Sequence, residues 1–235
     1  MDIILIPGFW LDASSWSKVT PALEAAGHTA HPLTLPGLES PEADRSGITL
    51  QDHIDAVIQV IDDLGGPVVL VGHSGGGAIA YGAVDARPKQ VVRTVYVDSG
   101  PLGEGGVIND ELPVNNGEIP LPEWHVFDDA DLTDLTDDLR TMFRSRSLPQ
   151  PAGVACDSQR LSADEGRWDV PATLIACGVP SAVLQQWSAK GELGRIKNVE
   201  YVDLPTGHWP QFTRPSDLGD AILAAVVRGG QVPVS

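Results

Sequence analysis

One stretch of the chain, residues 68–81, restricts the possible folds more than any other. Four apolar residues lead into Gly72-His73-Ser74-Gly75-Gly76-Gly77, and small and apolar residues then continue at helical spacing to Ala86. The pattern predicts a buried strand, a tight turn and a helix, with Ser74 on the turn. Glycines two positions before and two positions after a serine are typical of a nucleophile elbow, because a Cβ at either place would collide with the neighbouring strand or helix. Such a turn exposes the serine hydroxyl above the edge of the sheet.

The same glycines could instead form a phosphate-binding loop. A P-loop, however, carries a lysine directly after its glycines, and a dinucleotide-binding turn spaces its glycines differently. This chain has Ala78 and Ile79 after Gly77, so the elbow is the better interpretation.

Apolar runs and helical periods alternate along most of the chain. Strands are expected over residues 2–6, 31–35, 68–71, 91–97, 172–176 and 199–204, and helices over residues 16–26, 50–64, 76–86, 181–189 and 215–227. Pro21 interrupts the first of these helices, and Thr49 and Asp52 suit the first turn of the second. Nearly all-apolar strands that alternate with helices predict an α/β fold, with a parallel sheet of six strands covered by helices on both faces.

The alternation stops between Gly103 and Gly166. This region contains prolines, glycines, an acidic run over residues 128–138 and scattered large apolar residues. We expect a cap of short helices inserted at residues 103–166, on a core domain made of residues 1–102 and 167–235.

Composition limits the class of protein. A chain of 235 residues is long enough for one domain with a full core, and a net charge of −17 argues against nucleic acid or an anionic membrane as a partner. The sequence has no apolar run of about 18 residues, no basic signal-like region after Met1, and too few cysteines for a disulfide framework. We therefore expect a cytoplasmic protein that does not bind membranes. The sequence does not indicate its oligomeric state.

A serine hydroxyl becomes a nucleophile when a base takes its proton, and the base acts best when a carboxylate orients it. His208 is the candidate base, because its loop follows the last predicted strand and it comes after the serine, as in other elbow enzymes. His73 flanks the serine and is expected to pack against the turn or brace it. The remaining histidines lack any supporting context: His28, His31, His53 and His125.

A negative charge that develops on a carbonyl oxygen needs backbone N–H donors already in place. One donor should be Gly75, directly after the serine, and the other should lie in the loop after the first strand. In that loop Phe9 is the preferred donor, Trp10 is the next, and Leu11 is a weaker candidate.

These motifs resemble those of the α/β-hydrolase superfamily over nearly the whole chain. The resemblance rests on four segments: Pro7-Gly8-Phe9 through Trp16, Gly72-His73-Ser74-Gly75-Gly76, Val95-Tyr96-Val97-Asp98, and Gly207-His208. More narrowly, the chain is similar to small bacterial esterase-like hydrolases related to plant methylesterases and hydroxynitrile lyases. Pro7 stands where that branch usually has histidine. The two strands that usually precede the first motif are missing, which is consistent with a sheet of six.

The resemblance implies an acidic residue after the penultimate strand, but Ser181 occupies that place. Glu192 lies too far along the following helix to replace it comfortably. Asp98 ends the strand after the elbow helix, at the same carboxyl edge of the sheet as the candidate nucleophile and base. Ligands and catalytic groups gather at that edge in open α/β sheets. We therefore predict Asp98 as the acid; alternatively, it only caps the turn over residues 99–101.

The sequence thus predicts a serine hydrolase that cleaves a small, mostly apolar carboxylic ester through an acyl-enzyme, with Ser74, His208 and Asp98 as catalytic residues. The expected partner is a small-molecule substrate, and neither a metal nor an organic cofactor is implied. Three tryptophans are expected to shape the substrate pocket, although each could equally pack in the core: Trp10, Trp124 and Trp209.

Other interpretations stay open. The same site could act on a lactone, an amide or a carbon–carbon bond. A lyase would need a cationic group near the serine, and none of the lysines is expected on a loop at the site. A ligand-binding receptor built on a hydrolase scaffold would explain why the usual acid is missing.

Overall fold

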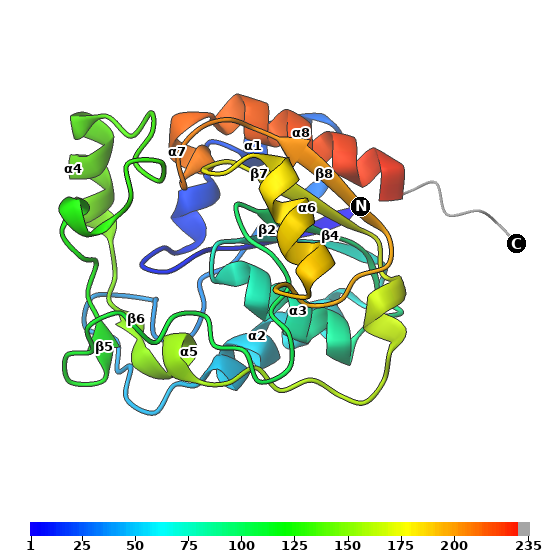
Figure 1. The fold of residues 1–235 in the computed structure, drawn as a ribbon, viewed down its shortest axis with the longest axis horizontal. Coiled ribbons are helices and arrows are strands. Elements are labelled where there is room, and N and C mark those ends of the chain that lie inside the picture. The colour runs from blue at the N-terminus through cyan, green and yellow to red at the C-terminus, as the bar shows by residue number, and fades with distance from the viewer. Residues whose placement is uncertain (230–235) are drawn as a thin grey trace, which may run out of the picture.

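Six strands form one sheet in the computed structural model, which describes residues 1–229 (Figure 1). The strands are β1 (Asp2–Ile6), β2 (Thr29–Pro32), β3 (Val68–His73), β4 (Val91–Val97), β7 (Ala172–Ala176) and β8 (Val199–Asp203). They lie in the order β2-β1-β3-β4-β7-β8, and every neighbouring pair is parallel. The predicted parallel sheet of six strands is confirmed.

The chain changes its direction of travel across the sheet between β1 and β3. From β1 it adds β2 on one side and then returns to add β3, β4, β7 and β8 on the other. The carboxyl ends of β1 and β3 therefore flank a topological switch point, which is where open α/β sheets bind their ligands. The predicted elbow after β3 and the predicted donor loop after β1 both lie there.

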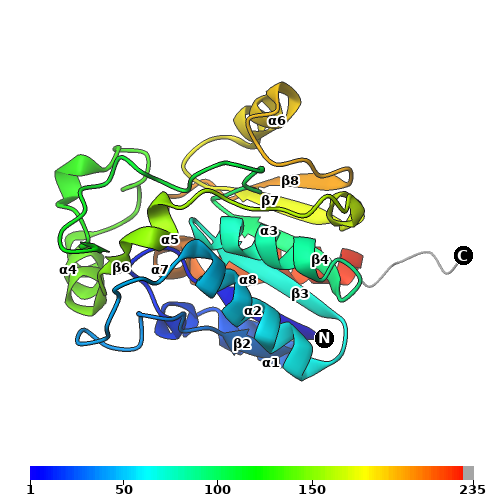
Figure 2. The ribbon, with the colours of Figure 1, turned by 90° about the horizontal axis from the view of Figure 1, so that it is seen from below.

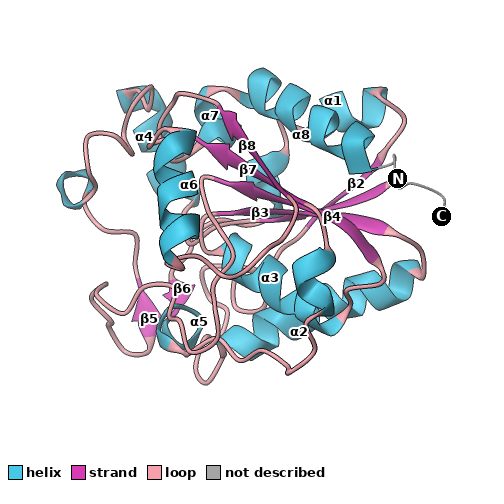
Figure 3. Ribbon diagram, turned by 45° about the vertical axis from the view of Figure 1, so that its right-hand side comes forward, coloured by secondary structure: helices cyan, strands magenta, loops and turns pink. Residues whose placement is uncertain are grey.

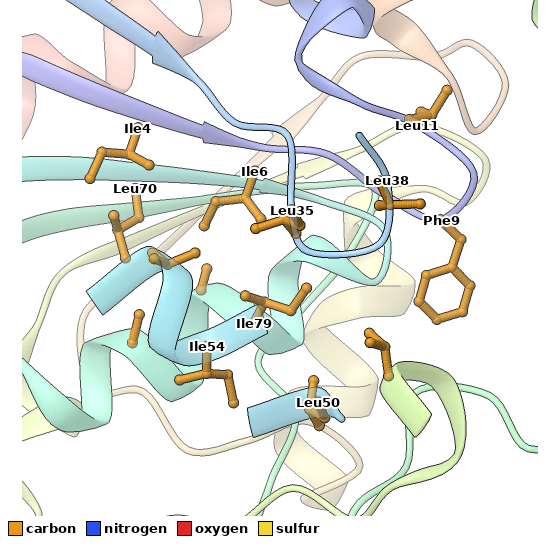
Figure 4. Packing of buried hydrophobic residues seen from close by; sticks show 14 of the residues in the cluster. Ile4, Ile6, Phe9, Leu11, Leu35, Leu38, Leu50, Ile54, Leu70 and Ile79 are labelled. Carbon is orange, nitrogen blue, oxygen red and sulfur yellow. The ribbon is translucent and has the colours of Figure 1, made fainter. Parts of the chain in front are cut away.

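Helices cover both faces of the sheet (Figure 3). One face carries α2 (Leu50–Leu64), α3 (Gly76–Ala86) and α6 (Ser181–Lys190), and the other carries α1 (Thr20–Ala25) and α8 (Pro215–Gly229). Ile4 and Ile6 of β1 point toward α2 and α3 (Figure 4), whereas Ile3 and Leu5 pack with α1 and α8. Because both faces of the strand meet an apolar layer, all of its residues after Asp2 are apolar.

Helix α2 begins and ends where its sequence predicts. Thr49 and Asp52 form a capping box: the Asp52 N–H donates to Thr49 Oγ1 at 3.2 Å, and the Thr49 N–H donates to Asp52 Oδ2 at 2.8 Å. Gly65 ends the helix in a left-handed conformation with φ 64°. Ile54 and Ile61 on its apolar side are buried beneath the sheet.

The second strand differs from its prediction. β2 covers residues 29–32 instead of 31–35. The N–H of Leu33 makes the last hydrogen bond to β1, to Leu5 O at 2.9 Å, and β1 itself ends at Ile6. Residues 34 and 35 therefore lie beyond the end of this ladder.

The first helix also differs from its prediction over residues 16–26. It is divided into a 3-10 turn, η1 (Ala13–Trp16), and the short helix α1. Pro21 lies in the first turn of α1, where its missing N–H removes no helical hydrogen bond. A further short helix, α7 (Pro210–Thr213), has no counterpart among the predicted elements.

Residues 103–166 form a group of short elements beside the sheet, drawn in green shades in Figures 1 and 2. They include β5 (Glu118–Ile119), η2 (Trp124–Val126), α4 (Asp137–Arg146), β6 (Gln150–Pro151) and α5 (Ala152–Cys156), and η3 (Gly166–Asp169) then leads into β7. The antiparallel pair of β5 and β6 is absent from the predicted elements. Trp10, in the loop after β1, donates from Nε1 to Ile119 O at 3.0 Å, so this segment packs at the carboxyl edge of the sheet.

The division into a core and a cap stays a prediction, and the end of the predicted core, residues 230–235, lies outside the described residues. Within residues 1–229, no helix combines the length and the apolar composition that crossing a bilayer requires.

Candidate active site

The turn between β3 and α3 has the geometry of a nucleophile elbow. Ser74 adopts φ 52°, a left-handed conformation that strains a residue with a side chain. A Cβ on Gly72 would lie 2.5 Å from the carbonyl oxygen of Gly76, and a Cβ on Gly76 would lie 2.6 Å from that of Pro7. The two glycines therefore allow β3, α3 and the end of β1 to approach closely. Ser99, which follows β4, donates a hydrogen bond from its Oγ to the Ser74 carbonyl and so stabilises the elbow.

A chain of hydrogen bonds joins Ser74, His208 and Asp98. Nε2 of His208 lies 2.8 Å from Ser74 Oγ, and Nδ1 of His208 lies 2.6 Å from Asp98 Oδ2. When Nδ1 carries the proton that is donated to the carboxylate, Nε2 can accept the proton of the serine. The structure thus brings together the three residues that the sequence proposes.

Asp98 is held at the end of β4 through its second carboxylate oxygen. Oδ1 accepts hydrogen bonds from the N–H groups of Cys177 at 2.9 Å and Gly178 at 3.1 Å, both just after β7. Burial acts to raise the pKa of Asp98, but the hydrogen bond and charge of His208, with the two backbone N–H groups, outweigh it and lower the pKa. Asp98 is therefore an ionised partner for a histidine that becomes charged.

Ser181, at the place where the resemblance implies an acid, has another partner. Its Oγ donates to Asp203 Oδ2 at 2.8 Å, and its N–H donates to Asp203 Oδ1 at 2.7 Å. The carboxylate at the end of β8 thereby binds the first turn of α6. Ser181 has a structural role here, and the carboxylate hydrogen-bonded to His208 is that of Asp98, directly after β4.

The two residues predicted to supply the oxyanion donors, Phe9 and Gly75, are in contact. A Cβ on Gly75 would lie 2.6 Å from the ring of Phe9, so the loop after β1 packs directly against the elbow. Within residues 1–229, neither backbone N–H donates to another backbone carbonyl. Gly75 also stands at the N-terminus of α3, where the helix dipole favours a negative charge.

The sequence model of the alpha/beta hydrolase family matches residues 3–221. The chain belongs to this family. Methylesterase 9 of Arabidopsis thaliana is 35% identical in an alignment that covers 94% of this chain and 96% of that protein. Methylesterase 7 of the same plant is 36% identical over 40% of this chain, and this match spans only 38% of the methylesterase.

Solved structures of other alpha/beta hydrolases have the same fold. The methylesterase MES16 from Arabidopsis matches with a TM-score of 0.78 and 19% identity over 97% of this chain and 99% of its own. An extracellular alpha/beta-hydrolase from a Paenibacillus species matches with a TM-score of 0.77 and 18% identity, over 96% and 98% of the two chains. At these identities the likeness shows the fold alone.

In this alpha/beta hydrolase a cleft of about 250 Å³ opens beside Ser74. Its walls combine apolar and polar groups, and they are formed by Ser74, Gly75, Ala78, Asp98, Ser99, Gly100, Pro101, Leu102, Ile108, Glu192 and Leu193. Glu192 therefore lines the cleft, although the carboxylate that contacts His208 is that of Asp98. Lys190, which the sequence places away from the site, has its Nζ 3.7 Å from Glu192 Oε1.

The three tryptophans predicted for the pocket belong to one aromatic cluster beside His208. Trp209 is 1% exposed, and its ring centre lies 5.1 Å from that of His208 and 6.0 Å from that of Trp124. Trp10 is also buried and joins the cluster through Phe127, with ring centres 5.9 Å apart. Of the described residues that line the cleft, none is one of these tryptophans. In the structure they pack the loop of His208 against residues 103–166.

One group of side chains among residues 1–229 has the spacing of a metal site. Asp98, Asp131 and His208 each place one potential ligand atom within 4.8 Å of the others. Both ring nitrogens of His208, however, already lie within hydrogen-bond distance of Asp98 and Ser74. A metal ion would have to replace one of these contacts, so we interpret the group as one that handles protons.

Two residues at the site belong to no recognisable sequence motif. Nε2 of Gln211 lies 3.2 Å from Nδ1 of His73, and both side chains are fully buried. Asp131 belongs to an acidic run, and nothing in the run distinguishes it from its neighbours. For Asp131 the sequence offers one hint, Gly207. A glycine beside the candidate base allows another segment of the chain to pack closely against that loop.

Proposed function

We propose that this chain is a serine hydrolase that cleaves a small, mostly apolar carboxylic ester through an acyl-enzyme. The hydrogen-bond chain from Ser74 through His208 to Asp98 carries the proposal. The alpha/beta hydrolase family and the methylesterase relatives support hydrolysis of an ester.

In the proposed reaction Nε2 of His208 takes the proton of Ser74 while the serine oxygen attacks the ester carbonyl. The ionised Asp98 stabilises the imidazolium that forms, and the backbone N–H groups of Phe9 and Gly75 hold the negative carbonyl oxygen. The imidazolium then gives its proton to the leaving alcohol. A water molecule, deprotonated by the same histidine, releases the acid and restores the serine.

The cleft favours a small substrate. Its volume of about 250 Å³ lies below the range of about 300–1,000 Å³ that is typical for drug-sized ligands. Leu102, Ile108 and Leu193 supply apolar contacts, and the carboxylate of Glu192 disfavours an anionic substrate. Methyl esters of small neutral acids are therefore the first substrates to test, in line with the names of the relatives.

We also propose that residues 103–166 act as a cap on the core. Ile108 from this segment lines the cleft, and the segment contacts the loop after β1 through Ile119. A segment that both lines the cleft and touches the donor loop would determine which acyl and alcohol groups fit.

Labelling with a fluorophosphonate, which reacts with an activated serine, tests the proposed function. The wild type should be labelled, and Ser74→Ala should not; Ser145→Ala, which removes an exposed serine on α4, is the matched control. Hydrolysis of p-nitrophenyl acetate and of small methyl esters should fall by about a thousandfold or more in Ser74→Ala.

Substrate panels separate the remaining possibilities. If the wild type is labelled but cleaves lactones, amides or carbon–carbon bonds in preference to esters, the proposed site stands and the proposed substrate class is wrong. A folded wild type that is neither labelled nor active on short esters would overturn the proposal and favour a ligand-binding receptor.

A further inference from the structure

Residues 131–134 clasp the loop that carries His208. The N–H of His208 donates to Asp131 O at 2.8 Å, and the N–H of Gly207 donates to Thr133 O at 3.0 Å. A Cβ on Gly207 would collide with both of these carbonyl oxygens. The position of the candidate base therefore depends on a segment outside the sheet.

The side chain of Asp131 also lies at the site. One oxygen of Asp131, one oxygen of Asp98 and a ring nitrogen of His208 are all within 4.8 Å of one another. Gly178 lies beside both carboxyl groups: a Cβ on Gly178 would lie 3.4 Å from Asp131 Oδ1 and 3.7 Å from Asp98 Oδ2. Asp131 is half-buried, so solvent screens its charge only in part.

The groups that face His208 differ in charge. Asp98 and Asp131 present carboxyl groups. His73 packs with its ring centre 5.0 Å away and is uncharged, because burial, aided by the charge of His208, lowers the pKa of His73 to about 3. The thiol of Cys177 lies near Asp98 and is neutral, because burial raises its pKa. The imidazole thus meets negative charge from two carboxyl groups and no opposing charge from these neighbours.

The charges of Asp131 and His208 influence each other. Burial raises the pKa of Asp131, the positive charge of His208 acts in the opposite direction, and the charges of Asp98 and Asp128 add to the effect of burial. Asp131 therefore ionises most readily when His208 is protonated. By the same coupling, an ionised Asp131 favours the protonated histidine.

We propose that Asp131 is a positioning residue that acts through His208, given the serine-hydrolase function proposed above. Its backbone carbonyl holds the base in place, and its carboxylate stabilises the imidazolium that forms as the serine attacks. His208 then has two carboxylates, one from the sheet and one from residues 103–166. The charge on the base therefore depends on the contact between this segment and the loop of His208.

An NMR titration of the full chain with ¹³C-labelled histidine reads the charge on His208 without requiring turnover, and His208→Gln assigns the signal. In Asp131→Asn the midpoint of this titration should fall by about half a pH unit to one unit, since one of two neighbouring negative charges is removed. Asp131→Glu keeps the charge and should restore the wild-type midpoint. Asp129→Asn removes an exposed carboxylate from the same loop and should leave the midpoint unchanged.

If Asp131→Asn folds and the midpoint of its His208 titration equals that of Asp129→Asn, the proposal is overturned. If Asp131→Asn does not fold, Asp131→Ser is the second neutral variant to titrate. The acid limb of kcat/KM for p-nitrophenyl acetate should move to lower pH with the NMR midpoint, which a merely loosened loop would not cause. If fluorophosphonate labels neither the wild type nor any of these variants, the serine-hydrolase proposal fails. The NMR midpoint would still decide whether Asp131 controls the charge of His208.

Discussion

Nε2 of His73 donates a hydrogen bond of 2.6 Å to the backbone carbonyl of His208, so the residue next to Ser74 holds the loop of the candidate base. Nδ1 of His73 accepts from the side chain of Gln211 at 3.2 Å, which fixes the tautomer needed for this donation. Because His73 is buried with a pKa of about 3, it stays neutral at physiological pH. The elbow thus positions both the serine and the histidine that would activate it.

Replacing His73 by phenylalanine keeps a ring of similar size and removes the donor. The His208 carbonyl would lose its partner, at a cost of about 1–3 kcal/mol, and the imidazole would shift relative to Ser74. We expect kcat/KM for p-nitrophenyl acetate to fall by about tenfold to a hundredfold. His73→Gln retains an N–H donor and should lose less, and His125→Phe, at an exposed site, should behave as the wild type. Wild-type activity in His73→Phe would contradict the positioning role.

The assignment of the acid can be tested with Asp98→Asn. Asn tolerates the φ of 43° at this position and keeps an oxygen for the N–H groups of Cys177 and Gly178, so the fold should persist. It cannot stabilise an imidazolium, and we expect kcat/KM to fall by about ten thousandfold.

The matched control for this experiment is Asp203→Asn. Asp203 also lies at the carboxyl edge of the sheet, but its partner is Ser181 and not His208. This variant should weaken the start of α6 and leave kcat/KM nearly unchanged. Loss of activity in Asp203→Asn with retention in Asp98→Asn would move the acid away from β4.

The features that the sequence predicts well are local ones. The elbow is visible because its glycines must stand at fixed distances from Ser74, and α2 is visible because Thr49 and Asp52 mark its start. The strands are visible because both faces of a central parallel strand are buried. Asp98 could be proposed because it ends a strand, and the ends of parallel strands meet at one edge of the sheet.

The features that the sequence does not predict depend on long-range contacts. The acidic run over residues 128–138 contains many equivalent carboxylates, and only the packing of that segment on Gly207 selects Asp131. The aromatic cluster illustrates the same limit: Trp209 follows the candidate base in sequence, but its ring is buried among aromatic side chains. A residue that is adjacent in sequence to a candidate catalytic residue need not line the same cleft.

The clasp on the loop of His208 predicts a strong effect of Gly207→Ala. The added methyl group would collide with the carbonyl oxygens of Asp131 and Thr133, so either the loop or residues 131–134 must move. We expect a loss of about 2 kcal/mol in the free energy of unfolding and a fall of about a hundredfold in kcat/KM. Gly66→Ala is the control, because a Cβ there meets only Leu64 O at 3.9 Å. Equal activities of the two variants would argue against the clasp.

The stability of the fold should depend on pH through His53, which lies on α2 away from the site. Its Nε2 donates to Pro36 O at 2.8 Å, and burial, the largest influence, lowers the pKa of His53 from 6.5 to about 4. Between these two values the unfolded chain binds the proton more tightly than the folded protein does. The stabilisation is therefore present above pH 6.5 and is lost as the pH falls toward 4.

His53→Gln isolates this effect, because glutamine can still donate to Pro36 O and does not titrate. Between pH 7 and 4.5 the wild type should lose about 2.5 kcal/mol more of its free energy of unfolding than the variant does. Asp98, whose pKa is also lowered, destabilises both proteins equally as the pH falls, so its contribution cancels in the difference. Urea denaturation followed by circular dichroism at the two pH values measures this difference, with His125→Gln as a control at an exposed position. Parallel losses in wild type and His53→Gln would show that the imidazole of His53 is charged within the fold or exposed to solvent.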